Sequence, residues 1–391
     1  MAIAKRVLES LDRASWIRRM FEAANQLRAE RGPDAVADLS LGNPCNEPPD
    51  EFFEALATES RERSGLRHAY MTNAGYPHVR EKVASNLSER TGVGYGADDI
   101  IMTPGAAGAL NLMMRALLDP GDEVVINIPS FVEYPFYIEN FGGQTCAVPD
   151  KPDFIPDVDR IADACTANTK AVILNAPNNP TGRIYPERFW MDLGRALAAR
   201  SAALSRPIDL IFDDPYRHVY YTAEPPPEPV RYYDQTIYVT SFSKDLGLAG
   251  DRIGFLAIHP GAAFRDELKA GLIFSMRALG QVSANATLQR CAAELVDVPR
   301  DSVREFYRQR RDRVAAALDE MGLEAPPLEG AFYAFPKSPE PDDLAFCRRS
   351  LDKGLVVVPG TAFGVPGHFR LSYAVPEDVL ERGLALLKQA L

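Results

Sequence analysis

The chain has 391 residues, 46% of them hydrophobic and 25% charged, a balance typical of globular proteins with a substantial core. Its net charge of -11 argues against nucleic acid or an anionic membrane surface as the main partner, because both favour basic proteins. The five cysteines are scattered and include no C-x-x-C pair, which fits free thiols better than a disulfide framework or a zinc site.

The N-terminal segment 1–27 carries charges throughout, so it predicts an amphipathic helix instead of a signal peptide. No stretch of about 18 consecutive apolar residues follows that would span a membrane. We therefore expect a cytoplasmic protein.

From about residue 98 onward, short apolar runs alternate with helical patterns. Helices are expected at 106–118 and from near Phe131. The predicted strands are 100–105, 123–129, 171–177, 209–214, 236–242 and 253–259. Such alternation favours an α/β fold with a largely parallel sheet between helices, and burial on both sides explains why the runs are nearly all apolar.

The C-terminal third has a different pattern. A charge-rich helix near 300–320 precedes three apolar runs, at 330–336, 355–360 and 369–375. They predict a small antiparallel or mixed sheet flanked by helices. We expect two domains. They are a large one at 47–285 and a smaller α+β one built from both chain ends, 1–46 and 286–391.

The segment TSFSKDLGLAGDRIG (240–254) is the most informative for function. Lys244 follows a predicted strand, Ser241 precedes it, and Arg252 lies eight residues later. A lysine beside hydroxyls and a fixed cation suits a Schiff-base lysine next to a phosphate. A lysine near serines is more often a solvated surface residue, so this motif needs support from others.

Two further motifs end predicted strands with polar residues. NAPNNPTGRIYP (175–186) projects amides from the carboxyl edge of the sheet, where ligands of open α/β sheets bind. In IFDDPYRHVYY (211–221), a buried carboxylate needs a cation or donor, which a protonated pyridine would supply. The alternatives are an ordinary Asn-Pro turn and an acid that caps the next helix.

The turn TPGAAGAL (103–110) places small residues at a helix start, where free N–H groups bind anions. A tight turn between a strand and a helix is the alternative reading. TGVGYG (91–96) is not a dinucleotide fingerprint, because it precedes the first strand and lacks the required spacing, which argues against a nicotinamide dehydrogenase. Four motifs at sheet carboxyl ends together predict one ligand site.

The combination SFSK…GxRxG, NNPTG and D-x-x-Y resembles the class I/II aminotransferases, pyridoxal phosphate (PLP)-dependent enzymes of fold type I. The resemblance extends from 39–44 to 369–374 and so covers essentially the whole chain. It implies a mostly parallel, seven-stranded-type sheet, PLP as cofactor, and a homodimer with active sites at the subunit interface.

The resemblance assigns the cofactor's ring to five residues. Lys244 matches the Schiff-base lysine, which would also carry the proton between substrate and cofactor, and Asp213 matches the acid paired with the pyridine nitrogen. Asn179 and Tyr216 match the pair that hydrogen-bonds the phenolic oxygen. Phe131 occupies the place of the aromatic that stacks on the ring.

The cofactor's phosphate would be held by Ser241, Arg252 and the backbone N–H groups of Ala106 and Ala107. This chain has Ala-Ala where relatives often have Ser, Lys or Gln, so a side-chain contact is missing there. Tyr70 matches the tyrosine that reaches the phosphate of the partner subunit.

The amino acid substrate would bind Arg370 through its α-carboxylate, close to Asn179 and the backbone at Gly42. Arg277 lies near a stretch that approaches the partner's pocket in relatives, which gives a preference for aspartate or glutamate. The alternative for Arg277 is a solvated arginine on a helix. Arg370 could instead form a salt bridge at a strand edge, and Tyr70 could be a packed aromatic residue.

The resemblance implies transamination, in which an L-amino acid gives its amino group to a 2-oxo acid. Other PLP chemistry on the same fold stays open, namely a C–S or cyclising lyase, a decarboxylase or an oxidase. A PLP-binding sensor without turnover is a third reading. It usually needs a fused DNA-binding domain, and only about 40 residues precede the catalytic motifs here.

Overall fold

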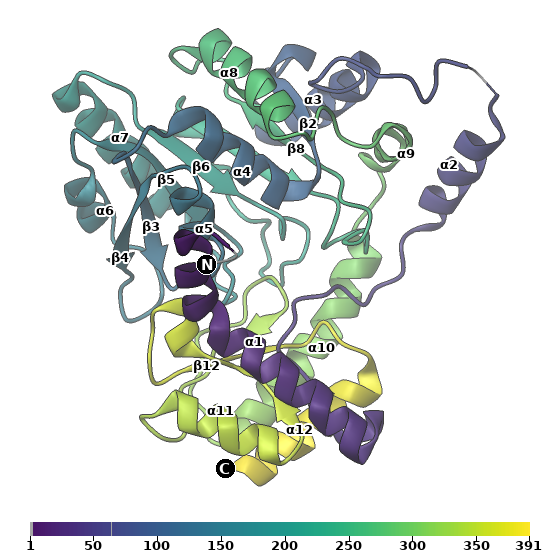
Figure 1. The fold of residues 1–391 in the computed structure, drawn as a ribbon, viewed down its shortest axis with the longest axis vertical. Helices are drawn as coiled ribbons and strands as arrows, with labels where there is room; N and C mark the ends of the chain where they lie inside the picture. The colour runs from purple at the N-terminus through teal and green to yellow at the C-terminus, as the bar shows by residue number, and fades with distance from the viewer. Residues whose placement is uncertain (1–2, 64) are drawn as a thin grey trace.

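The computed structural model describes residues 3–63 and 65–391, leaving out the side chains of residues 12–21 and 33 (Figure 1). Residues 1 and 2 of the N-terminal segment thus lie outside the described residues. The predicted N-terminal helix is present as α1 (Lys5–Arg31).

A seven-stranded sheet forms the centre of the larger part of the molecule, with strand order β2-β8-β7-β6-β5-β3-β4. Its strands are β2 (Ile100–Thr103), β3 (Glu123–Ile128), β4 (Gln144–Pro149), β5 (Thr169–Asn175), β6 (Asp209–Asp213), β7 (Thr236–Ser241) and β8 (Gly254–Ile258). β8 runs antiparallel to β2 and β7, and the other four pairs of strands in this sheet are parallel, so the predicted mostly parallel α/β sheet is confirmed.

Alternate strand residues face two separate apolar cores. Val172 and Phe212 pack against one set of helices, and Ile173 and Ile211 pack against the other. The first set is α3 (Pro77–Thr91), α6 (Val158–Ala164), α7 (Glu187–Leu204) and α9 (Ala286–Leu295). The second is α4 (Gly105–Leu117), α5 (Tyr134–Glu139) and α8 (Arg265–Ala278). Burial on both faces accounts for the apolar strand sequences.

The smaller part joins both ends of the chain (Figure 1). β1 (Ala37–Asp38) pairs in parallel with β10 (Leu355–Val356), while β11 (Val358–Pro359), β12 (Phe369–Ser372) and β9 (Tyr333–Ala334) form an antiparallel sheet. The helices here are α1, α10 (Asp301–Glu320), α11 (Asp343–Asp352) and α12 (Glu377–Ala390). The prediction of a small mixed sheet flanked by helices agrees with this arrangement.

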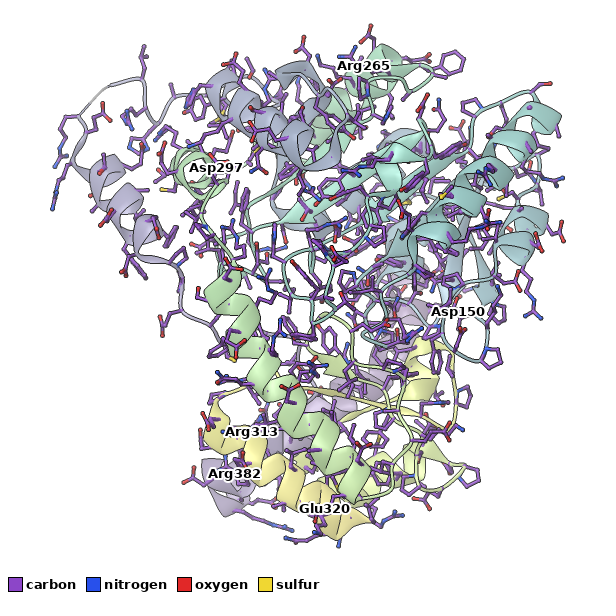
Figure 2. All side chains as sticks on the ribbon, turned by 180° about the vertical axis from the view of Figure 1, so that it is seen from behind. Asp150, Arg265, Asp297, Arg313, Glu320 and Arg382 are labelled. Atoms are coloured by element: carbon purple, nitrogen blue, oxygen red, sulfur yellow. The ribbon has the colours of Figure 1, made fainter. Side chains whose placement is uncertain are left out.

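Ion pairs join α10 to α12 on the outer surface of the smaller part (Figure 2). Arg313 contacts Glu377 and Glu381 of α12 at 2.7 Å each, and Glu320 pairs with Lys388 at 2.5 Å. These pairs are exposed and therefore add little stability, so the two helices are held mainly by their buried apolar faces.

Side-chain caps explain where three of the helices begin. Asp157 accepts hydrogen bonds from the N–H groups of Asp159 and Arg160 at the start of α6. Asn285 and Asp342 cap α9 and α11 in the same way.

The remaining elements are the helix α2 (Asp50–Arg61) and the short 3-10 helices η1 (Pro33–Ala35), η2 (Ala97–Asp99), η3 (Pro229–Arg231) and η4 (Gly360–Phe363).

The domain boundaries at 47–285, with 1–46 and 286–391, stay a prediction. Most buried residues from α10 onward pack with those of α1 and β1, whereas Cys291 and Leu295 of α9 pack in the core of the large sheet. Among the described helices, none is both long and apolar enough to cross a membrane.

Candidate active site

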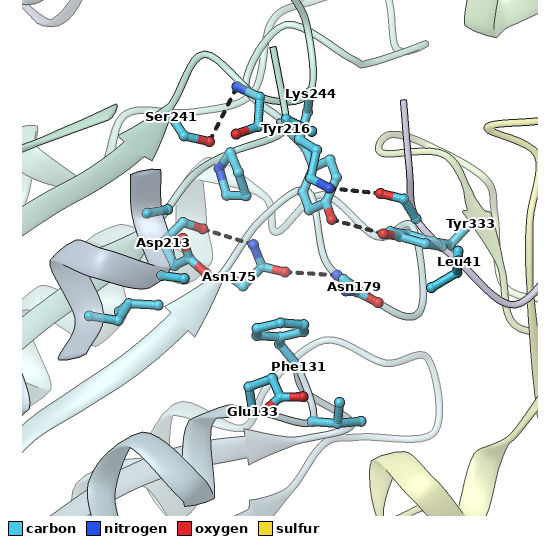
Figure 3. Close-up of a pocket in the computed structure, with 18 of the residues that line it drawn as sticks. Leu41, Phe131, Glu133, Asn175, Asn179, Asp213, Tyr216, Ser241, Lys244 and Tyr333 are labelled. Atoms are coloured by element: carbon cyan, nitrogen blue, oxygen red, sulfur yellow. Dashed lines mark hydrogen bonds between the residues drawn. The ribbon is translucent and has the colours of Figure 1, made fainter. Parts of the chain in front are cut away.

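One pocket of about 410 Å³ lies at the carboxyl ends of the parallel strands, where the two parts of the molecule meet (Figure 3). The location follows from topology, because loops after β2, β3, β5, β6 and β7 all leave the same edge of the sheet. Most of the predicted site residues line it. They are Gly42, Ala106, Ala107, Phe131, Asn179, Asp213, Tyr216, Ser241, Lys244, Arg252 and Arg370.

Lys244 follows the end of β7 and extends into this pocket (Figure 3). Its Nζ donates to the carbonyl oxygen of Gly42 at 2.7 Å. Burial is the main cause that lowers the pKa of Lys244 to about 8. The nearby charges of Arg370 and Arg252 lower it as well, whereas the charge of Asp213 acts in the opposite direction. A larger fraction of the amine is therefore neutral than for an exposed lysine, as a nucleophile or base requires.

Asp213 ends β6, and its carboxylate is buried beneath the pocket. Oδ2 accepts a hydrogen bond from Tyr134 at 2.6 Å, whereas Oδ1 has no partner within the described part of the chain. Burial raises the pKa of Asp213 to about 6, although Tyr134 and Lys244 act in the opposite direction. A buried oxygen without a partner requires a donor or cation from a ligand.

A hydrogen-bonded chain fixes the turn after β5 (Figure 3). The Asn175 amide donates to the Asp213 carbonyl at 2.8 Å, and the Asn179 backbone N–H donates to Asn175 Oδ1 at 2.7 Å. Arg370 donates to Asn179 Oδ1 at 2.8 Å, linking the large sheet to β12. The Asn-Pro turn is therefore a rigid wall of the pocket.

Arg370 is a buried cation, and no acidic partner is found for it among the side chains that the structure describes. Nη2 donates to the Ser40 carbonyl at 2.5 Å, while Nε has no partner in the same described set. The guanidinium lies over the rings of Tyr333 and Phe363, 4.6 and 4.9 Å from their centres. Burial lowers its pKa, so an anionic ligand would stabilise it.

Tyr216 and Tyr333 complete the side of the pocket next to Arg370. Their hydroxyl oxygens are 3.0 Å apart, and burial raises the pKa of Tyr216 well above its usual value, so its phenol remains a donor. A Cβ at Gly42 would lie 1.7 Å from the Tyr333 hydroxyl. Glycine is thus required at position 42 for the loop to approach this tyrosine.

The opposite end of the pocket has donors suited to an anion. Ala106 and Ala107 lie in the first turn of α4, whose N-terminal N–H groups have no intrahelical acceptors. Arg252 donates to the Ala249 carbonyl at 3.0 Å and lies beside Gly105, where an added Cβ would be 3.0 Å from the guanidinium. Gly105 also has φ +76°, so a larger residue there would be strained.

Two predicted site residues lie outside the pocket of this chain. Tyr70 is 91% exposed, and its expected contact concerned a partner subunit. Arg277 is exposed on α8 and is not among the residues that line the pocket. Asp214, the neighbour of Asp213, forms a buried ion pair with Arg217 instead of facing the pocket.

Several residues in and next to the pocket were not proposed from the sequence, among them Asn175, Glu133 and Tyr333, which line it, and Tyr134, which donates to Asp213. Asn175 opens the NAPNNPTG motif, and Tyr134 and Glu133 follow Phe131 closely, so their positions next to proposed residues were the available signal. Tyr333 was read only as part of a strand, and nothing in its local sequence indicates that it contacts Tyr216.

Comparisons with known proteins agree with this geometry. Residues 34–387 match the family model for aminotransferase class I and II. The chain is 35% identical over 367 residues to a probable aspartate/prephenate aminotransferase of Thermus aquaticus, covering 92% of each protein. It is 33% identical to the aspartate/prephenate aminotransferase of Thermus thermophilus, again with 92% of each chain covered.

Solved structures show the same relationship. An amino transferase from Eubacterium rectale has a TM-score of 0.94 at 30% identity, covering 100% of this chain and 98% of that one. A single mutant of Thermus thermophilus aspartate aminotransferase has a TM-score of 0.89 at 30% identity, with 100% of both chains covered. The chain therefore belongs to the class I and II aminotransferase family.

Proposed function

We propose that this aminotransferase binds PLP in the pocket and uses it to move the amino group of an L-amino acid to a 2-oxo acid. The aminotransferase activity follows from the family. The observation that supports PLP binding is the position of Lys244 between a buried, partly unpaired carboxylate and two cations without acidic partners among the described residues.

The pocket residues fit the three chemical ends of PLP. Asp213 Oδ1 is an unpaired buried acceptor that suits a protonated pyridine nitrogen. Arg252, Ser241 and the N-terminal turn of α4 suit the phosphate, and Lys244 Nζ suits the aldehyde carbon. Phe131 offers a ring that can stack on the pyridine.

The side chains around these ends have distinct tasks. PLP, when bound, withdraws electrons from the α-carbon of the amino acid. Lys244 would hold the cofactor through Nζ, and the same amine, when free, would take and return the α-proton of the substrate. Asp213 would keep the pyridine nitrogen protonated. Tyr216 donates from its hydroxyl, and Arg370 fixes the substrate α-carboxylate so that the α-proton is directed toward Lys244.

A spectroscopic experiment tests the proposal. Purified protein supplied with PLP should show a visible band that shifts when an amino donor is added and returns when a 2-oxo acid is added. Release of a 2-oxo acid without amino transfer would instead favour a lyase or oxidase, and release of CO₂ and an amine would favour a decarboxylase. No response to a broad set of donors, despite bound PLP, would favour a binding protein without turnover.

Side-chain selectivity and assembly require separate tests. Because relatives are named for aspartate, a screen of amino donors should include aspartate and glutamate, with an Arg277→Ala variant beside the native chain.

A homodimer would bury the exposed Tyr70 and Leu66, which are 91% and 80% accessible. Light scattering measures the assembly directly. A cytoplasmic location stays a prediction.

Replacement of Arg370 by lysine is expected to raise KM for amino donors by about 10- to 100-fold, with a smaller change in kcat. Lysine keeps the charge but loses the planar fork that holds both Asn179 and a substrate carboxylate. Steady-state kinetics with one donor over a range of concentrations measure the effect. An unchanged KM would exclude Arg370 as the carboxylate anchor.

A further inference from the structure

Five described residues that line the pocket carry charged side chains. Under the proposed function, four of them have a partner that does not vary between substrates. Lys244 and Arg252 serve the cofactor's aldehyde and phosphate, Asp213 serves its pyridine nitrogen, and Arg370 serves the α-carboxylate. The fifth charged residue is Glu133, and neither PLP nor the common part of an amino acid provides a cation for it.

Glu133 also has no structural task that would explain a half-buried carboxylate. It occupies the N-cap position of α5, yet its side chain makes no capping hydrogen bond. No hydrogen bond or ion pair joins its carboxylate to any other part of the chain that the structure describes. Partial burial raises its pKa, and no neighbouring cation offsets that effect.

The backbone around Glu133 is held firmly. Phe131 precedes it by two residues and lines the pocket (Figure 3). Tyr134 follows it and makes a hydrogen bond of 2.6 Å to Asp213. The position of Glu133 is therefore set by Phe131, which we assign to the cofactor, and by Tyr134, which contacts Asp213. Glu133 lines the same cavity next to Phe131 (Figure 3), and it also borders a second pocket lined by Arg6 and Ser10 of α1.

An apolar wall connects the α-carboxylate anchor to Glu133. The Arg370 guanidinium lies 4.9 Å from the centre of the Phe363 ring. Phe363 and Val358 pack in one apolar cluster, against which Val132, the residue before Glu133, is packed. All three apolar residues also line the pocket. A substrate held by Arg370 can thus extend methylene groups along this wall toward the carboxylate.

We infer that Glu133 selects amino donors whose aliphatic side chain ends in an ammonium group, as in L-ornithine or L-lysine. This inference rests on the proposed function and assigns its substrate class. The methylenes contact Phe363, Val358 and Val132, and the ammonium pairs with the Glu133 carboxylate. A dicarboxylic donor would instead place a second anion beside Glu133, which is unfavourable in a partly desolvated pocket.

The kinetic test compares L-ornithine with L-norvaline, which has the same carbon chain without the ammonium group, and with L-glutamate. The native enzyme should have its highest kcat/KM with ornithine. Glu133→Gln should lower the ratio of kcat/KM for ornithine over norvaline by about 10- to 100-fold. Glu133→Lys should reverse the preference toward glutamate. A matched control is Glu81→Gln on the exposed face of α3, which should keep the native ratio.

A binding experiment gives a readout that is independent of turnover. In calorimetry with PLP-loaded protein, 4-guanidinobutanoate presents a carboxylate to Arg370 and a cation to Glu133, whereas pentanoate lacks the cation. The native protein should bind the guanidino compound at least about tenfold more tightly than pentanoate, and Glu133→Gln should remove this difference. Equal binding of both compounds by the native protein would overturn the inference.

The outcomes also separate this inference from the proposed function. A native preference for glutamate over ornithine that persists in Glu133→Gln would reject the role of Glu133 while transamination itself stands. Absence of transamination with every donor would reject the proposed function. The binding difference between the two carboxylates would still decide whether Glu133 recognises a cation.

Discussion

Replacing Lys244 with alanine is expected to lower kcat for transamination by about 10⁴-fold, the largest effect of any single substitution in the pocket. The methyl group can neither hold PLP covalently nor carry the α-proton. The fold should persist, because Nζ makes one hydrogen bond, to the Gly42 carbonyl, and removing it also removes a partly desolvated cation.

Borohydride reduction followed by peptide mass spectrometry measures the covalent role. The native protein should carry the cofactor's mass on Lys244, and the alanine variant should carry none. Added methylamine should restore part of the turnover of the variant, since a small amine can occupy the vacated volume and move the proton. Lys151→Ala, an exposed lysine outside the pocket, is the control and should behave as native. Native turnover in Lys244→Ala would contradict the mechanism.

The sequence indicates the ligand site because strand ends can be recognised locally. Asp213, Lys244 and Asn179 each follow an apolar run, and parallel strands bring their carboxyl ends to one edge. The same rule missed β4, the edge strand, whose residues are mostly exposed or half-buried and therefore lack a continuous apolar run. Burial on both faces, more than strand propensity, made the other strands recognisable.

Contacts between distant parts of the chain could not be predicted in this way. Arg370 and Asn179 are 191 residues apart, and Tyr216 and Tyr333 are 117 apart, so their pairing depends on how the smaller part packs against the large sheet. The unpaired oxygen of Asp213 likewise appears only when every neighbour has been placed. Local patterns predicted the residues that we assign to the cofactor, whereas the walls of the pocket around the proposed substrate required the tertiary structure.

Glu133 illustrates the same limit for specificity. In the sequence it is one acid within IPSFVEY, and only the structure shows that it lines the pocket without a capping bond. Arg277 shows the converse, because the sequence made it a candidate for substrate recognition while the structure places it on the exposed surface of α8. Its expected role, like that of Tyr70, concerns a second subunit.

Asp213→Asn is expected to lower kcat by about 10²- to 10³-fold, the second largest effect. The amide has nearly the same shape and still accepts a hydrogen bond from Tyr134, so the pocket should keep its geometry. It has no negative charge, however, and cannot keep the pyridine nitrogen protonated, so PLP withdraws electrons less effectively. Single-turnover kinetics with one donor isolate the chemical step from product release.

Tyr134→Phe separates the charge of Asp213 from its positioning. Burial raises the pKa of Asp213 to about 6 against the opposing effect of the Tyr134 hydrogen bond, so loss of that bond should raise the pKa further. The carboxylate exists above its pKa. PLP binding by the cofactor-free native protein should therefore weaken as pH falls through about 6, and in Tyr134→Phe it should weaken at a higher pH. Asp213→Asn should lose this pH dependence. A native titration curve in both variants would show that the Asp213 carboxylate does not bind the cofactor.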